Sequence, residues 1–133
     1  MPLSYYTAKL WTMCNPNPTI ELPAGADLAT YQRYIHDLES LHGWLDVDLV
    51  HNCFLMGEEV GELFKAIRKY KKYFVDTATP DTQSSSAAQR KEDVAEELVD
   101  VFNYLLALAN RLDIDLESAF RKKNARNQTR SWS

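Results

Sequence analysis

The sequence predicts an all-α protein, an antiparallel bundle of about four helices in each chain. Apolar residues recur at intervals of three and four in four successive stretches, which is the pattern of helices with one buried face. Most connections between these stretches are short, which favours antiparallel neighbours. A chain of 133 residues is long enough for one domain with its own core, so we expect 1–133 to be a single domain.

Residue types that start and stop helices mark the ends of these stretches. Gly43 follows the first helix, and Asp115 has the place of an N-cap before the fourth. Ser86 and Gln89 have the spacing of a capping box before the third helix, whose apolar residues continue to Leu112. The predicted helices cover 27–43, 47–74, a third segment that follows Ser86, and 115–128.

Two segments lack a helical pattern. The leader, residues 1–26, is punctuated by Pro and Asn and contains Tyr5, Tyr6 and Trp11. The segment 76–89 is polar, rich in Ser and Thr and interrupted by a proline, so we expect a mobile loop there.

The two long predicted helices carry more apolar surface than one chain is expected to cover. The stripe of the second helix contains Leu55, Leu63, Ala66, Ile67 and Tyr70. The stripe of the third contains Val94, Leu98, Val101, Leu105, Leu108 and Leu112. We therefore expect the chain to complete its core by pairing with itself, as a homodimer or a dimer of dimers.

The composition excludes several functional classes. The net charge of −4 argues against a general nucleic-acid or membrane-surface binder, and no apolar run has the length of a membrane span. Cys14 and Cys53 are isolated from each other and from any metal-ligand spacing, which is typical of reduced thiols. We expect a cytoplasmic protein with neither nucleic acid nor membrane as partner.

Two pairs of carboxylates stand where a buried helix face would place apolar residues. Glu59 and Glu62 lie three residues apart within the stripe of the second helix. Glu97 and Asp100 repeat this spacing beside the stripe of the third. If these helices pack antiparallel, the four carboxylates converge on one site.

Four convergent anions repel each other and are costly to bury unless a cation lies among them. Oxygen ligands without His or Cys suit Mg²⁺, with Mn²⁺ as a substitute. A single pair of acids at this spacing is usually a solvated helix surface, and the pattern alone leaves that alternative open for both pairs.

The stretch GEEVGELFKAI and the later stretch EELVDVFNYLLALANRLDIDLESAFRKKNARNQTR together resemble the all-α NTP pyrophosphatases. This MazG-like superfamily includes dCTP pyrophosphatases and dimeric dUTPases. Its pattern of EExxE, a spacer and ExxD, followed by K-x3-N-x2-R, is met here by Glu58, Glu59, Glu62, Glu97, Asp100, Lys123, Asn127 and Arg130. The spacer of 34 residues between Glu62 and Glu97 is long for the family, which leaves substrate specificity open.

The resemblance implies a role for each matching residue. Glu59, Glu62, Glu97 and Asp100 would ligate Mg²⁺, with Glu58 in the outer shell or at a second metal. A catalytic water would be oriented by Glu59 or Glu62, with Glu58 beside them. The triphosphate would be contacted by Lys123, Asn127 and Arg130. Tyr104, Asn103 and Trp44 would border the nucleoside.

The implied reaction is hydrolysis of a (deoxy)nucleoside triphosphate to the monophosphate and pyrophosphate, a reaction suited to cleansing the nucleotide pool. Phosphoribosyl-ATP pyrophosphohydrolase is an alternative within the superfamily. A non-catalytic helical module that binds nucleotide or a protein partner is an alternative from another class. A carboxylate-bridged di-iron bundle is a third, because Glu39 and His42 form one ExxH motif.

Overall fold

The computed structural model describes residues 19–72 and 86–131, and the regular structure in these ranges is entirely α-helical. The predicted all-α fold is thereby confirmed. The helices in chain order are α2 (Leu28–His42), α3 (Leu49–Tyr70), α4 (Ala87–Arg111) and α5 (Leu116–Thr129). Most of the predicted leader and most of the predicted Ser/Thr-rich loop lie outside the described residues.

Each helix begins after a short polar residue whose side chain accepts a hydrogen bond from the first turn. Asp27 Oδ1 accepts from the Thr30 N–H at 2.8 Å, and Asp48 Oδ1 accepts from the Val50 N–H at 2.8 Å. Such caps satisfy backbone donors that have no partner within the helix. Asp115 caps α5 in the same way, as the sequence predicted.

The predicted capping box before α4 is only half formed. Ser86 Oγ accepts from the Gln89 N–H at 3.0 Å, but the side chain of Gln89 donates to Asp93 at 2.9 Å instead of reaching back. Because α4 already begins at Ala87, the predicted loop 76–89 was too long at its end.

The predicted end of the second helix was also too late. α3 ends at Tyr70, and Lys72 has a φ of 56°, a left-handed conformation that a continuing helix cannot contain. The end of α2 was predicted correctly, since Gly43 adopts the left-handed conformation with a φ of 74°.

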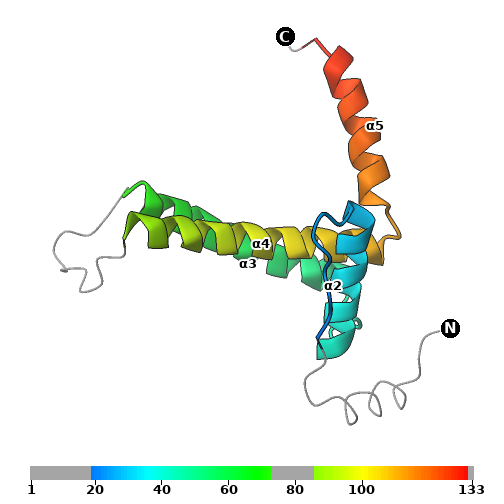
Figure 1. The fold of residues 1–133 in the computed structure, drawn as a ribbon, viewed down its shortest axis with the longest axis horizontal. Helices are drawn as coiled ribbons and strands as arrows, with labels where there is room; N and C mark the ends of the chain where they lie inside the picture. The colour runs from blue at the N-terminus through cyan, green and yellow to red at the C-terminus, as the bar shows by residue number, and fades with distance from the viewer. Residues whose placement is uncertain (1–18, 73–85, 132–133) are drawn as a thin grey trace.

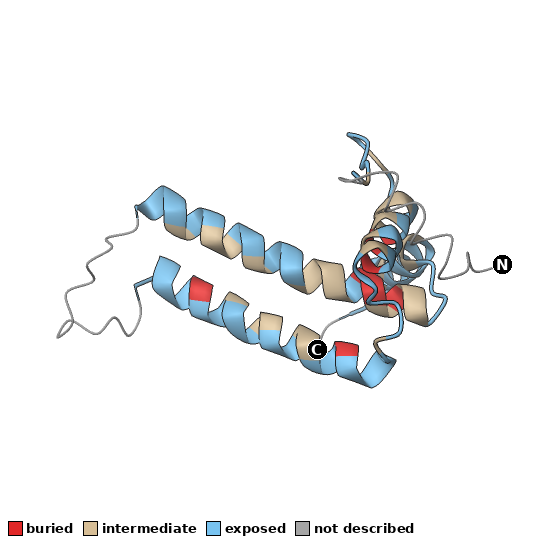
Figure 2. Ribbon diagram, turned by 90° about the horizontal axis from the view of Figure 1, so that it is seen from below, coloured by how far each residue is buried: buried red, intermediate tan, exposed pale blue. Residues whose placement is uncertain are grey.

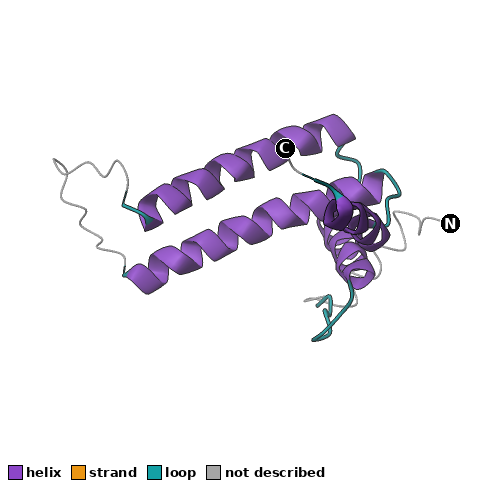
Figure 3. Cartoon of the chain, turned by 90° about the horizontal axis from the view of Figure 1, so that it is seen from above, coloured by secondary structure: helices purple, strands orange, loops and turns teal. Residues whose placement is uncertain are grey.

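The fold consists of a long antiparallel pair, α3 and α4, with α2 crossing it near one end (Figures 1 and 3). Helix α5 packs against α2 and leads away from the α3–α4 pair (Figure 1). None of the described helices combines the length and the hydrophobicity needed to cross a membrane.

The buried core lies where α2 crosses α4, as the concentration of buried positions in Figure 2 shows. Its centre is formed by Ile35, Leu106 and Ala107. Partly buried side chains pack around this centre, namely Leu28, Tyr31, Tyr34, Leu38, Phe102 and Leu116. The core is therefore short compared with the α3–α4 pair, most of which extends beyond it.

A polar contact fastens the crossing and fixes the start of α5. Gln32 Nε2 donates to Asn110 Oδ1 at 3.1 Å and to the Ile114 carbonyl at 2.8 Å. Gln32 Oε1 in turn accepts from the Leu116 N–H at 3.0 Å. Gln32 is almost fully buried, so these bonds hold three elements in one register.

Half of the predicted apolar stripe of α4 is open in this chain, because Val94, Val101 and Leu108 are partly buried but the other three residues are not. Leu98, Leu105 and Leu112 are 53%, 44% and 52% exposed, whereas the buried residues of α4 are Leu106, Ala107 and Ala109. The buried face of α4 is the one that meets α2. The α3–α4 pair by itself leaves the opposite face of α4 exposed to solvent. The predicted face of α3 is likewise open at Ile67 and Tyr70.

Candidate metal and active site

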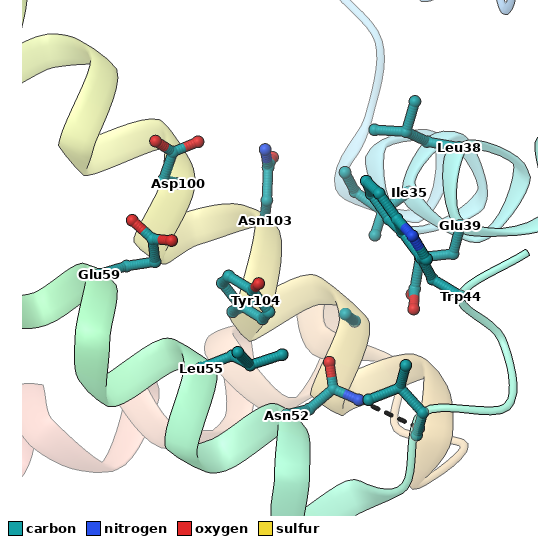
Figure 4. Close-up of a pocket in the computed structure, with 12 residues that line it drawn as sticks. Ile35, Leu38, Glu39, Trp44, Asn52, Leu55, Glu59, Asp100, Asn103 and Tyr104 are labelled. Carbon is teal, nitrogen blue, oxygen red and sulfur yellow. Dashed lines mark hydrogen bonds between the residues drawn. The ribbon is translucent and has the colours of Figure 1, made fainter. Parts of the chain in front are cut away.

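Three carboxylates converge midway along the α3–α4 pair. Glu59 from α3 and Glu97 and Asp100 from α4 each place one carboxylate oxygen within 4.8 Å of the others. Figure 4 shows Glu59 and Asp100 facing each other across the two helices. Antiparallel packing thus brings together residues that the spacer separates widely in sequence.

It is unfavourable for all the carboxylates of this cluster to be charged at once when no cation lies among them. The pKa of Glu59 is raised, first by burial and then by the negative charges of Asp100, Glu97, Glu58 and Glu62. Desolvation and like charges both disfavour the carboxylate form of an acid. The site therefore favours either a proton or a cation, and the donor set consists of the oxygens preferred by hard divalent ions.

The fourth predicted ligand, Glu62, lies outside this group of three. Its carboxylate pairs with Lys65 Nζ at 3.1 Å, and its side chain is 53% exposed. Glu58 is also exposed, and it acts on Glu59 through charge. The structure thus brings together three of the four predicted metal ligands, and the roles of Glu62 and Glu58 stay predictions.

A pocket of about 440 Å³ adjoins the carboxylates (Figure 4). Glu59 and Asp100 lie on one side of it, and its other walls come from α2, from the α2–α3 connection and from both long helices. The three residues predicted to border the nucleoside, Tyr104, Asn103 and Trp44, all line this pocket. Their contact with a nucleoside stays a prediction.

Tyr104 stands between the carboxylates and the apolar part of the pocket. Its pKa is raised by burial and then by the charges of Glu59 and Asp100. The phenol therefore keeps its proton at neutral pH and can donate a hydrogen bond.

Trp44 lies at the edge of the pocket because of the way α2 ends. Its backbone N–H donates to the Glu39 carbonyl at 2.8 Å, a bond of the type that closes a helix after a left-handed glycine. Its ring stacks on His42 with centroids 4.4 Å apart, and half of the residue is exposed. An aromatic face is thereby available beside the pocket.

An ion pair buried in the pocket wall was missed by the sequence reasoning. Arg111 Nη1 donates to Glu39 Oε1 at 3.0 Å, and Nη2 donates to Glu39 Oε2 at 2.5 Å. Arg111 also donates to the carbonyls of Val47 and Trp44, at 2.8 and 3.0 Å. The pair therefore ties α4 to α2 and to the connection that carries Trp44.

This ion pair also argues against the di-iron alternative, which would need Glu39 and His42 as metal ligands. Glu39 is engaged by Arg111, and the His42 ring is stacked on Trp44. Neither residue of the ExxH motif joins the cluster of three carboxylates.

The predicted phosphate contacts lie on α5, away from the carboxylates within this chain. Lys123 is exposed, Asn127 Nδ2 donates to Asn124 at 3.2 Å, and Arg130 is the C-cap. Figure 1 shows α5 leading away from the α3–α4 pair. One chain by itself therefore does not bring these three residues to the acidic site.

Comparison with known proteins identifies the family. Residues 52–132 match the MazG nucleotide pyrophosphohydrolase domain, which is more than half of the chain. The chain belongs to the MazG nucleotide pyrophosphohydrolase family. It is also 30% identical over 95 residues to the uncharacterized protein YvdC of Bacillus subtilis (strain 168), an alignment covering 71% of this chain and 86% of that protein.

The MazG match includes only part of the pocket. It contains Glu59, Glu97 and Asp100, but it begins after Glu39 and Trp44. The part of the pocket wall that α2 and Trp44 contribute therefore lies outside the matched residues.

Proposed function

We propose that this MazG protein hydrolyses a nucleoside triphosphate to the monophosphate and pyrophosphate with the help of Mg²⁺. The observation that carries the proposal is the position of Glu59, Glu97 and Asp100 beside a pocket with an aromatic residue at its edge. This arrangement offers a cation site next to a space for a nucleoside, and family membership supplies the reaction class.

Mg²⁺ is the proposed ion, with Mn²⁺ as a substitute, because the converging ligands are carboxylates and the site is open to substrate. When bound, such an ion neutralises phosphate oxygens and lowers the pKa of a bound water. Glu59 and Glu62 would orient that water, and Glu58 adds negative charge that holds the cation. Tyr104, Asn103 and Trp44 would hold the sugar and the base.

We further propose that the functional unit contains at least two copies of the chain. Five large apolar side chains on the two long helices are exposed, namely Leu98, Leu105 and Leu112 on α4 and Phe54 and Phe64 on α3. Exposed apolar surface on a helix pair is typical of a face that another chain covers. A second copy is the natural cover for these faces. Lys123, Asn127 and Arg130 would then reach the triphosphate in an active site of another copy.

The rival functions make different predictions. A non-catalytic module would bind nucleotide or a partner without releasing pyrophosphate. A phosphoribosyl-ATP pyrophosphohydrolase would cleave that compound in preference to simple triphosphates. The three converging carboxylates favour catalysis over mere binding, because a binding module has no need of a self-repelling cluster.

The experiment is pyrophosphate release from a panel of nucleoside triphosphates, with and without excess EDTA. We expect pyrophosphate as product with Mg²⁺ present, and no turnover in EDTA. Glu97→Gln should abolish turnover, whereas Glu96→Gln, one residue away and exposed, should retain it. Release of orthophosphate, activity in EDTA or an active Glu97→Gln would each contradict the proposal.

A further inference from the structure

Asn52, in the first turn of α3, is a buried polar residue that the reaction proposed above does not use. It is 3% exposed and lines the pocket beside the carboxylates. Its side-chain nitrogen donates to two backbone carbonyls, of Val47 at 3.1 Å and of Asp48 at 3.0 Å. Both hydrogens of the amide are thereby engaged.

These two bonds determine which way the amide faces. A carbonyl oxygen only accepts, so the nitrogen of Asn52 has to be the atom turned toward Val47 and Asp48. The amide oxygen is consequently directed away from them, and Figure 4 shows it pointing into the pocket below Tyr104. Among the described residues, this oxygen has no donor within hydrogen-bonding distance. An acceptor that a buried residue holds in this orientation, open to the pocket, can serve a donor on a bound molecule.

A second acceptor lies in the same wall. The Val47 carbonyl accepts from both Asn52 and Arg111, and Arg111 holds the carboxylate of Glu39. Each Glu39 oxygen receives one bond from Arg111 and keeps further accepting capacity. Figure 4 shows Glu39 and Asn52 on the Trp44 side of the pocket, away from Asp100. That side offers two fixed acceptors next to an aromatic ring.

We propose that Asn52, with Glu39 beside it, recognises an exocyclic amino group on the base, so that the preferred substrates carry cytosine or adenine. The proposal rests on the nucleotide function proposed above. An amino group has two hydrogens, one for each acceptor. A keto group at the same position would turn its lone pairs toward the Asn52 oxygen and the Glu39 carboxylate. A uracil or hypoxanthine base has one ring N–H beside that keto oxygen and satisfies at most one of the two acceptors.

Recognition can be measured by binding, independently of catalysis. The full-length protein is titrated calorimetrically with CMP, UMP, AMP and IMP, which form two pairs differing in an amino or keto group at one position. We expect the amino member of each pair to bind about 10- to 100-fold more tightly, the range that one or two hydrogen bonds provide. Equal affinities, tighter binding of the keto members, or binding of none of the four would overturn the proposal.

A variant with a side chain of nearly the same shape tests whether Asn52 causes the preference for amino bases. Asn52→Leu removes the acceptor, and the affinities within each pair should then differ less than threefold. Gln89→Leu, an exposed position outside the pocket, is the matched control and should keep the wild-type ratio. Circular dichroism shows whether Asn52→Leu keeps its helices. If the variant does not fold, the affinity ratios of the wild-type protein decide the proposal. A folded Asn52→Leu that still prefers the amino members would assign recognition to other residues. Because monophosphates are products, these outcomes do not depend on whether the protein hydrolyses triphosphates.

Discussion

Removing Arg111 should destabilise this protein more than removing any exposed arginine. Its side chain is 13% exposed, and its guanidinium makes two bonds to the Glu39 carboxylate and also donates to the carbonyls of Val47 and Trp44. Arg111→Met keeps much of the aliphatic stem but leaves a nearly buried carboxylate without its counter-charge. Breaking a buried pair by removing one partner costs about 3–5 kcal/mol.

This cost converts into a large shift in melting temperature. The entropy of unfolding of a 133-residue chain corresponds to about 3–4 °C for each kcal/mol, so we expect Tm to fall by roughly 10–18 °C. The assay is thermal unfolding followed by circular dichroism, at one protein concentration because assembly also affects Tm. Arg121 is the matched control, since its pair with Glu117 is exposed on α5. Arg121→Met should cost less than about 1 kcal/mol.

The double variant Glu39→Leu/Arg111→Met distinguishes charge burial from lost packing. If the cost of Arg111→Met comes from the unpaired carboxylate, removing that carboxylate should restore much of the lost stability. The reasoning would be refuted if Arg111→Met melted within a few degrees of Arg121→Met. A double variant as unstable as the single one would show that the lost carbonyl bonds, rather than the charge, set the cost.

Two further predictions concern the proposed active site. Burial and like charges raise the pKa of Glu59 above 4.5, so its contribution to stability is fully present below that pH and is lost as pH rises through the raised pKa. Without metal, Glu59→Gln should therefore gain stability relative to wild type as pH rises above 4.5, and Mg²⁺ should raise its Tm much less than that of wild type. A wild-type Mg²⁺ response in the variant would contradict ligation by Glu59. Arg130→Ala should lower kcat/KM by roughly ten- to a hundredfold, the worth of a charge-assisted hydrogen bond, with little change in Tm. Mixing it with Glu59→Gln should restore part of the activity if the two residues act across copies of the chain, whereas a monomer in light scattering would exclude that arrangement.

The sequence by itself predicted the four helices and the carboxylates of the acidic site, three of which converge in the structure. The caps predicted at Ser86 and Asp115 are local side-chain contacts with the first turn of a helix, so residue type and spacing suffice to predict them. The carboxylate pairs were visible because acids interrupt an apolar stripe, and the resemblance to the MazG-like superfamily rested on the same residues. The end of α3 at Tyr70 was misplaced because no glycine marks that boundary, whereas the start of α4 was marked by Ser86 although the predicted loop was continued to residue 89.

The tertiary structure decided which residues meet. Glu39 and Arg111 are 72 positions apart, and no local pattern indicates that their side chains meet. Which face of α4 is buried depended on where α2 crosses it, so Leu98 and Leu105 remained open although their spacing was that of a core stripe. The orientation of the Asn52 amide depended on the chain before α3 turning its carbonyls toward the helix. Such features follow from long-range packing, because a side chain's partners are set by the register of whole helices rather than by its neighbours in sequence.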